Sequence, residues 1–300
     1  MAGKGIYYES QFEEATIELL REAHWQYTFG DDIHRKYTDP LIEEDLRNFL
    51  AAQYKDRDLT TSEIDGIVAN LRNTGGQNDY YALRNAFLLY RDGYDFAYSD
   101  GRDNPFRLEY IDFEHPDHNI FRCVNQFVME QGRENRRPDI LLFVNGIPVC
   151  IIELKNPTKQ NATIRDAHTQ ICTRYMRDIP ALLKYCALAV ISDGAKNALG
   201  TIYTPFEFFY EWKKIENEDK AGKGLDTLRT LIRGALSPER ILEILRDYVY
   251  FPDPTKEDDT TEIVCRYPQF FAANKLYENI KLHLRPEGDG KGGTYFGATG

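Results

Sequence analysis

The chain has 300 residues, of which 42% are hydrophobic and 13% aromatic, enough for one large buried core or one domain plus a fragment. Its formal net charge of -11 excludes a protein that coats nucleic acid through a broad basic surface, so any DNA contact is local or supplied by a partner. Neither a spanning run of about 20 apolar residues nor the apolar core of a signal peptide occurs, so we expect a cytoplasmic protein.

The first 92 residues are predicted to be mostly helical. A helix that opens at Ser10, with Glu13 three residues later as in a capping box, places Phe12, Leu19 and Ala23 on one face. Further helices are predicted over about 41–53, over 62–72 behind a Thr60/Glu63 capping box, and over 80–91.

The middle of the chain is rich in β-forming residues. Turn signals separate the runs FRLEYIDF, NIFRCVNQFVME, PDILLFVNG and IPVCIIELK, which we interpret as successive strands of one sheet. Asn145-Gly146 is a strong hairpin signal, so Asp139 and Glu153 should lie on adjacent antiparallel strands.

The rest of the pattern completes an α/β prediction: a mixed β-sheet flanked by helices, with a helical N-terminal part. After the hairpin we expect a helix over about 162–177, a buried strand in KYCALAVIS, a short strand near 201–204, and helices near 224–234 and 238–249.

Three polar side chains stand at the ends of the two hairpin strands. Strand alternation places Glu153 and Lys155 on one face, and Asp139 enters the facing strand at the end opposite Glu153. Two carboxylates and one ammonium group suit phosphodiester hydrolysis with Mg²⁺, and the Leu154 carbonyl is a further candidate ligand. For an isolated match of this kind, the better interpretation is a solvated strand end and a turn cap.

The surrounding sequence favours the catalytic interpretation. RPDILLFVNGIPVCIIELKNPT resembles the nuclease motif of the HsdR family, the restriction and motor (R) subunits of type I restriction-modification enzymes, within the restriction-endonuclease-like PD-(D/E)xK group. The resemblance covers most of residues 100–212. It implies a restriction-endonuclease-like fold in which Asp139 and Glu153 are metal ligands and Lys155 is the catalytic lysine.

The resemblance also implies the substrate and partners. Members of this family cut double-stranded DNA after ATP-driven translocation, in complex with methyltransferase (M) and specificity (S) subunits. An assembly module with a silent nuclease site, and a stand-alone nuclease acting on branched or single-stranded DNA, remain alternatives.

Other residues have less specific assignments. The family pattern Q-x-x-x-Y is represented by Gln170 and Tyr175, but four residues separate them here. An i, i+5 offset brings two helical residues to one face less well than i, i+4, so a surface glutamine and a core tyrosine are an equal alternative. A first-helix glutamate approaches the metal in many related nucleases, yet the capping box is the preferred explanation of Glu13.

Basic and metal-ligating side chains occur near the predicted site. Arg133, Arg136 and Arg137 either hold a DNA phosphate or form a solvated loop. His115 and His118 form an isolated H-x-x-H in a predicted turn, which favours turn residues over a metal site because no further ligand is in view. The five scattered cysteines form no C-x-x-C pair and indicate neither a disulfide framework nor a zinc site.

We predict an endonuclease domain over residues 1–250, with a helical part over 1–92 and the catalytic sheet over about 100–212. A linker over 251–262 and the truncated start of a first motor domain over 263–300 follow. In the HsdR family, GGTYFGATG marks the beginning of a nucleotide-binding motif, to which Gly297 and Gly300 would belong, and Gln269 matches an adenine-reading glutamine. Gln269 is equally explained as an exposed first-turn residue. Without the lysine of that motif, ATP is expected as a cofactor of the full-length protein only.

Overall fold

A computed structural model describes residues 3–155, 163–216, 222–252 and 260–294. The chain forms two compact units, Met1–Val264 and Cys265–Gly300.

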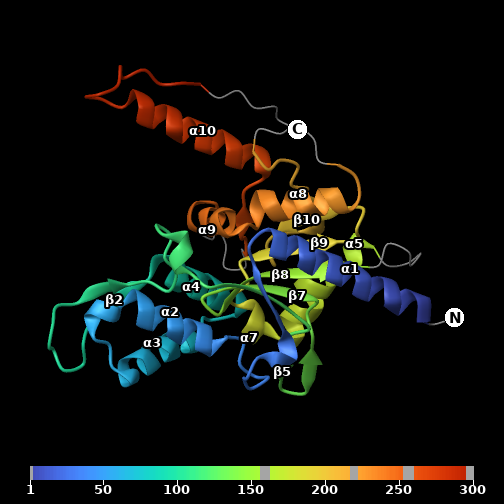
Figure 1. Cartoon of the computed structure of the whole chain (residues 1–300), viewed down its shortest axis with the longest axis horizontal. Coiled ribbons are helices and arrows are strands. Elements are labelled where there is room, and N and C mark those ends of the chain that lie inside the picture. Colours follow the sequence, from blue (N-terminus) through green and yellow to red (C-terminus); the bar gives the residue numbers. More distant parts are fainter. Residues whose placement is uncertain (1–2, 156–162, 217–221, 253–259, 295–300) are drawn as a thin grey trace. The chain divides into compact units, whose positions relative to one another are not determined.

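A six-stranded mixed sheet is the centre of the first unit (Figure 1). The neighbours β1–β4 and β8–β9 are parallel, whereas β4–β7, β7–β8 and β9–β10 are antiparallel. In sheet order the strands are β1 (Gln26–Phe29), β4 (Phe121–Asn125), β7 (Ile140–Val144), β8 (Ile147–Leu154), β9 (Leu188–Ser192) and β10 (Asn197–Gly200).

Helices cover the sheet and form a neighbouring helical part. α1 and α8 pack against each other, with α1 also on β8 and α8 on β10, while α5 packs on β8 and β9 (Figure 1). The helices are α1 (Gly3–Glu22), α2 (Glu43–Gln53), α3 (Thr61–Asn73), α4 (Asp79–Asp92), α5 (Ile164–Thr169), the π-helix η4 (Gln170–Tyr175), α6 (Met176–Asp178), α7 (Pro180–Leu183), α8 (Leu225–Ala235) and α9 (Pro238–Asp247).

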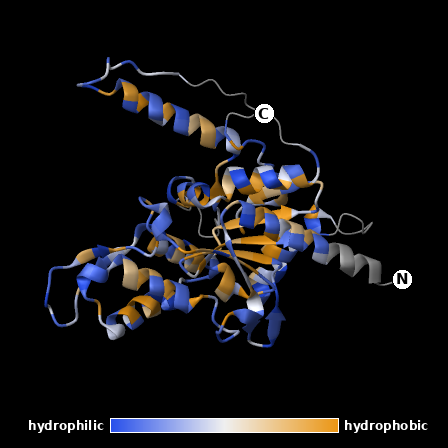
Figure 2. Ribbon diagram, viewed as in Figure 1, coloured by the Kyte–Doolittle hydropathy of each residue, from blue (hydrophilic) through white to orange (hydrophobic). Residues whose placement is uncertain are grey.

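The sheet carries the core because its central strands are buried on both faces. Every residue of β7, β8 and β9 is buried, and these strands form the orange centre of Figure 2. Such continuous apolar runs are typical of strands covered on both sides by helices. The α/β fold with a central mixed sheet and a helical N-terminal part is therefore confirmed.

The predicted Asn145-Gly146 turn joins β7 to β8. Both residues have positive φ, 50° and 76°, as a two-residue hairpin turn of type I′ requires. Asn145 is fully buried, and its side chain accepts a hydrogen bond from the Ile120 N–H at 2.7 Å and donates one to the Tyr110 carbonyl at 2.9 Å. The turn is thus fixed to two earlier segments of the chain, at Tyr110 and Ile120.

Gly146→Ala is expected to destabilise the protein by about 3–4 kcal/mol, because left-handed strain adds to a backbone clash. A methyl group there would lie 2.1 Å from the Ile42 carbonyl oxygen, which cannot move without shifting the start of α2. Gly132→Ala is the matched control, since its φ is also positive but nothing lies within 4 Å, so about 1–2 kcal/mol is expected. Urea denaturation measures both variants; equal losses would contradict the clash.

Several sequence predictions need correction. FRLEYIDF does not join the main sheet: β3 (Phe106–Leu108) pairs only with β2 (Tyr94–Phe96) in a separate hairpin. The run NIFRCVNQFVME divides between β4 and β5 (Met129–Gln131), which pairs with β6 (Glu134–Arg136). The short strand expected near 201–204 lies earlier, as β10, because its pairing with β9 is set by a tight turn after Ser192.

The second unit contains the helix α10 (Tyr267–His283), and Gln269 lies in its first turn. The predicted linker 251–262 is only partly described, and Gly297 and Gly300 lie outside the described residues. In the described segments, no helix is long and apolar enough to cross a membrane.

Glu262 lies buried just before β12 (Ile263–Val264), which pairs with β11 (Val249–Tyr250). Burial raises the pKa of Glu262 well above its usual value. The Thr201 side chain lowers the pKa and offsets this effect only in part. The folded chain therefore favours the neutral acid, whereas the unfolded chain ionises above about pH 4.3. The folded protein consequently loses stability as the pH rises above about 4.3 towards the pKa that Glu262 has in the folded chain.

Glu262→Gln should remove this loss, making the variant more stable than the parent chain at pH 8 and similar to it at pH 4. Urea midpoints at the two pH values test the prediction, because the difference between variant and parent isolates Glu262 from other titrating groups. A difference that does not change with pH would contradict it.

Candidate active site

Asp139 and Glu153 face each other at the open end of the β7–β8 hairpin. Asp139 immediately precedes β7, and the pairing of Ile140 with Ile152 places Asp139 opposite Glu153. The Leu154 backbone N–H donates a hydrogen bond of 2.8 Å to Asp139 Oδ2. The predicted adjacency of the two carboxyl groups is therefore confirmed.

The two carboxyl groups share a buried environment. Burial raises the pKa of Asp139 to about 6, against the opposing effects of the Leu154 N–H and the Lys155 charge. Burial and then the charge of Asp139 raise the pKa of Glu153, which is only 1% exposed, well above its usual value. Two carboxyl groups placed together in this way hold a proton between them unless a cation replaces it.

Lys155 is held in a closed ring of hydrogen bonds. Its Nζ donates to Glu153 Oε1 at 2.7 Å and to Gln170 Oε1 at 2.9 Å. Gln170 Nε2 donates to the Tyr175 hydroxyl at 2.7 Å, and that hydroxyl donates to Glu153 Oε2 at 3.4 Å. The ring fixes the position of the ammonium group beside the carboxyl pair.

A π-helical turn explains why Gln170 and Tyr175 meet. The segment η4 widens the helix, and the Met176 N–H reaches the Ile171 carbonyl five residues earlier. In this geometry residues five apart share a face, as residues four apart do in an α-helix. Of the two interpretations left open for the i, i+5 offset, the structure shows the one in which the side chains meet, because the π turn absorbs the extra residue.

Glu13 also lies at this end of the sheet. Its carboxylate accepts hydrogen bonds from Asn125 Nδ2 at 2.6 Å and from Gln126 Nε2 at 2.9 and 3.1 Å, and its charge contributes to raising the Asp139 pKa. The capping-box interpretation of Glu13 is wrong, since α1 begins at Gly3 and Ser10 lies inside it. The long-range contacts with the end of β4 gave no local signal in the sequence.

The oxygen atoms at this site suit a hard divalent cation. Asp139 and Glu153 offer carboxylate oxygens, and Glu13 is a third carboxylate nearby. Because the N–H and C=O of one strand residue point to the same edge, the Leu154 carbonyl faces the Asp139 side of β8. A buried carboxyl pair that must otherwise retain a proton fits Mg²⁺, which prefers oxygen ligands.

The predicted arginine cluster is divided by its contacts. Arg136 is bound to Asp178 and Glu134, at 2.7 and 2.5 Å, so it braces the β5–β6 hairpin against α6 rather than being free for a phosphate. Arg133 at the hairpin tip and Arg137 are exposed. The sequence could not distinguish them, because Asp178 lies 42 residues beyond Arg136.

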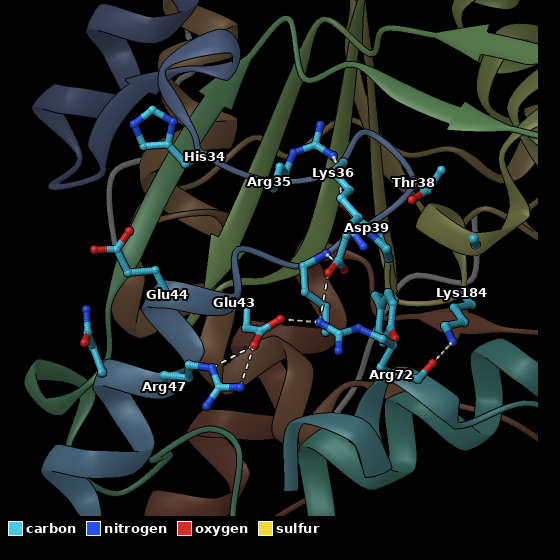
Figure 3. A pocket seen from close by; sticks show the side chains of 15 residues that line it. His34, Arg35, Lys36, Thr38, Asp39, Glu43, Glu44, Arg47, Arg72 and Lys184 are labelled. Carbon is cyan, nitrogen blue, oxygen red and sulfur yellow. Dashed lines mark hydrogen bonds and ion pairs between the residues drawn. The ribbon is translucent and has the colours of Figure 1, made fainter. Parts of the chain in front are cut away.

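A cavity of about 770 Å³ lies elsewhere, between the segment 34–41, α2 and the residues around Lys184 (Figure 3). Its cations are largely paired within the protein: Arg72 with Asp39 and Glu43, and Lys184 with backbone carbonyls at the end of α3. None of the predicted catalytic residues lines it. The cavity therefore adds nothing to the carboxylate site.

In the second unit, the exposed Gln269 side chain accepts a hydrogen bond from the Arg266 N–H at 2.9 Å and so caps the first turn of α10. This contact gives Gln269 a structural role without any nucleotide.

Known proteins similar to this chain are type I restriction enzyme subunits. Residues 6–208 match the family model of the type I restriction enzyme R protein N terminus (HSDR_N). The chain is 27% identical over 293 residues to the type I restriction enzyme HindI endonuclease subunit of Haemophilus influenzae, covering 94% of this chain and 27% of that protein. It is 30% identical over 291 residues to the putative type I restriction enzyme MjaVIIIP endonuclease subunit of Methanocaldococcus jannaschii, covering 93% and 26%. The chain thus spans about a quarter of the length of these relatives.

Proposed function

Because the chain belongs to the type I restriction enzyme R protein N-terminus family, we propose that it is the Mg²⁺-dependent endonuclease domain of an R subunit and hydrolyses phosphodiester bonds of double-stranded DNA. The observation that supports this most strongly is the convergence of Asp139, Glu153 and Lys155, with Gln170 and Tyr175 holding the lysine.

Asp139, Glu153 and the Leu154 carbonyl would hold the metal ion. When bound, Mg²⁺ polarises the scissile phosphate and acidifies a water molecule. Once their shared proton has left, the two carboxylates give the site a negative charge that attracts the cation, and the low exposure of Glu153 strengthens this attraction.

Lys155 acts beside the metal ligands. Its Nζ, fixed by Glu153 and Gln170, presents a positive charge where negative charge accumulates on the phosphate in the transition state, and it orients the attacking water. Tyr175 and Gln170 act through Lys155 and Glu153 and are positioning residues.

Glu13 supplies a third carboxylate beside Asp139. Asn125 and Gln126 hold it by their side-chain amides, so it can accept a hydrogen bond from a water molecule at the metal without moving. Arg137, exposed and two residues before Asp139, is the better placed of the predicted arginines to contact a DNA phosphate.

The remaining assignments concern a longer protein. The relatives are endonuclease subunits about four times the length that matches this chain. We propose that cutting follows ATP-driven translocation by motor domains, in a cytoplasmic complex with methyltransferase and specificity subunits.

The test is DNA cleavage by the full-length subunit assembled with those partners. Glu153→Gln, which keeps the shape of the buried side chain, should assemble and hydrolyse ATP but not cut DNA. Cleavage at the parental rate would refute the assignment. A parent complex that assembles and hydrolyses ATP in Mg²⁺ without cutting would favour the alternative of an assembly module with a silent site.

A further inference from the structure

The loop between β3 and β4 brings together one carboxylate and two imidazoles. Asp112, His115 and His118 each offer a ligand atom, and these atoms lie within 4.8 Å of one another. Nδ1 of His118 is 2.9 Å and Nδ1 of His115 is 3.3 Å from Asp112 Oδ2. The two rings stack with their centroids 4.8 Å apart, so both present their nitrogen atoms to the same carboxylate.

Contacts other than those of the histidine side chains hold the loop in this shape. Asn119 bridges its two ends, accepting from the Asp112 N–H at 2.9 Å and donating to the Asp112 carbonyl at 2.7 Å. The buried Asn145 side chain donates to Asn119 Oδ1 at 2.8 Å, and Gln53 of α2 donates to Asp112 Oδ2 at 3.0 Å. Arg246 of α9 reaches the Phe113 carbonyl at 3.4 Å. The ligand atoms are therefore pre-positioned by three other parts of the first unit.

The donor atoms and exposure of the three side chains also suit a cation. Asp112 is 4% exposed, and its carboxylate accepts hydrogen bonds from the Gln53 side-chain amide and the His115 N–H. The side chains of His115 and His118 are 64% and 50% exposed, which leaves room for water as further ligands.

We propose that Asp112, His115 and His118 bind a divalent transition-metal ion such as Zn²⁺ or Ni²⁺, separately from the nuclease site. In a tetrahedral site with ligands at about 2.0–2.2 Å, neighbouring ligand atoms are about 3.3 Å apart. The two carboxylate–imidazole separations, 2.9 and 3.3 Å, are close to this value, and the imidazole nitrogens, within 4.8 Å of each other, would approach by rotation of the exposed rings. Imidazole nitrogens favour these ions, whereas the oxygen ligands of the nuclease site favour Mg²⁺.

The consequence of binding is a tighter fold around the hairpin turn. The loop already contacts α2, α9 and the Asn145 turn, so an ion that joins Asp112 to His115 and His118 stabilises the junction of these elements. An ion that binds only the folded chain raises the thermal unfolding midpoint.

Titration of the metal-free chain with Co²⁺ tests this proposal. Co²⁺ is the probe because a site with imidazole ligands and few waters gives an intense visible absorption, whereas octahedral oxygen sites absorb weakly. We expect one equivalent with intense absorption, which Zn²⁺ displaces, and a higher thermal midpoint with Zn²⁺. His118→Ala and His115→Ala, both exposed changes that the fold tolerates, should each weaken binding by at least about tenfold.

Two controls locate the ion. His34→Ala removes an exposed histidine outside the cluster, and Asp139→Asn alters the nuclease site; both should retain the intense absorption. No such absorption in the parent chain, or equal absorption in His118→Ala, overturns the proposal. Loss of the absorption in Asp139→Asn alone also overturns it, by placing the ion at the nuclease site.

Discussion

Lys155→Ala is expected to lower DNA cleavage by the assembled full-length enzyme by about 10²–10³-fold or more while leaving divalent metal binding in place. The lysine Nζ contacts Glu153 and Gln170 but is not a metal ligand, and its removal leaves the oxygens of Asp139 and Glu153 unchanged. Plasmid linearisation measures cleavage, calorimetry with Mn²⁺ measures binding, and ATP hydrolysis should remain at the parental rate.

Two further variants make the result specific. Asp139→Ala should lose both metal binding and cleavage, because it removes a ligand. Lys196→Ala, an exposed lysine in the turn before β10, is the matched control and should cut as the parent does. Parental cleavage by Lys155→Ala, or loss of metal binding together with cleavage in that variant, would contradict the role assigned to Lys155.

Metal affinity of the chain is expected to rise steeply with pH, by up to about tenfold per pH unit for each proton displaced. The metal-free site retains a proton because burial raises the pKa of Asp139 to about 6 and that of Glu153 well above its usual value. A cation that occupies the site must release it. Calorimetry between pH 5.5 and 7.5, in buffers with different ionisation enthalpies, counts the protons released.

Glu153→Gln is the control for this pH dependence, since it removes one of the two carboxyl groups that share the proton. It should release fewer protons and bind metal more weakly at every pH. It should also make the metal-free chain more stable at neutral pH, because carboxyl groups with raised pKa values favour unfolding as pH rises. Metal affinity that does not change across pH 5.5–7.5 would contradict the raised pKa values.

The hairpin and its polar ends were predictable because the information is local. Asn145-Gly146 specifies the turn, the strand period specifies the facing residues, and the apolar runs specify burial. These three features placed Asp139 opposite Glu153 and put Lys155 on the same face as Glu153, as the structure has them.

Features that depend on distant contacts were not predictable. Glu13 has the local appearance of a cap, and only its contacts with Asn125 and Gln126, more than 100 residues later, bring it to the site. Sequence periodicity assumes a regular α-helix, so it could not anticipate the π turn that joins Gln170 to Tyr175. Where tertiary contacts select the conformation, the local sequence pattern does not predict it.

An anomalous difference map from crystals of the chain soaked in Mn²⁺ is the direct test of whether Asp139 and Glu153 bind a divalent metal ion. We expect a peak at about 2.2 Å from oxygens of both carboxylates, with Lys155 still bound to Gln170. No peak between the two carboxylates at millimolar Mn²⁺, with the side chains ordered, would contradict it.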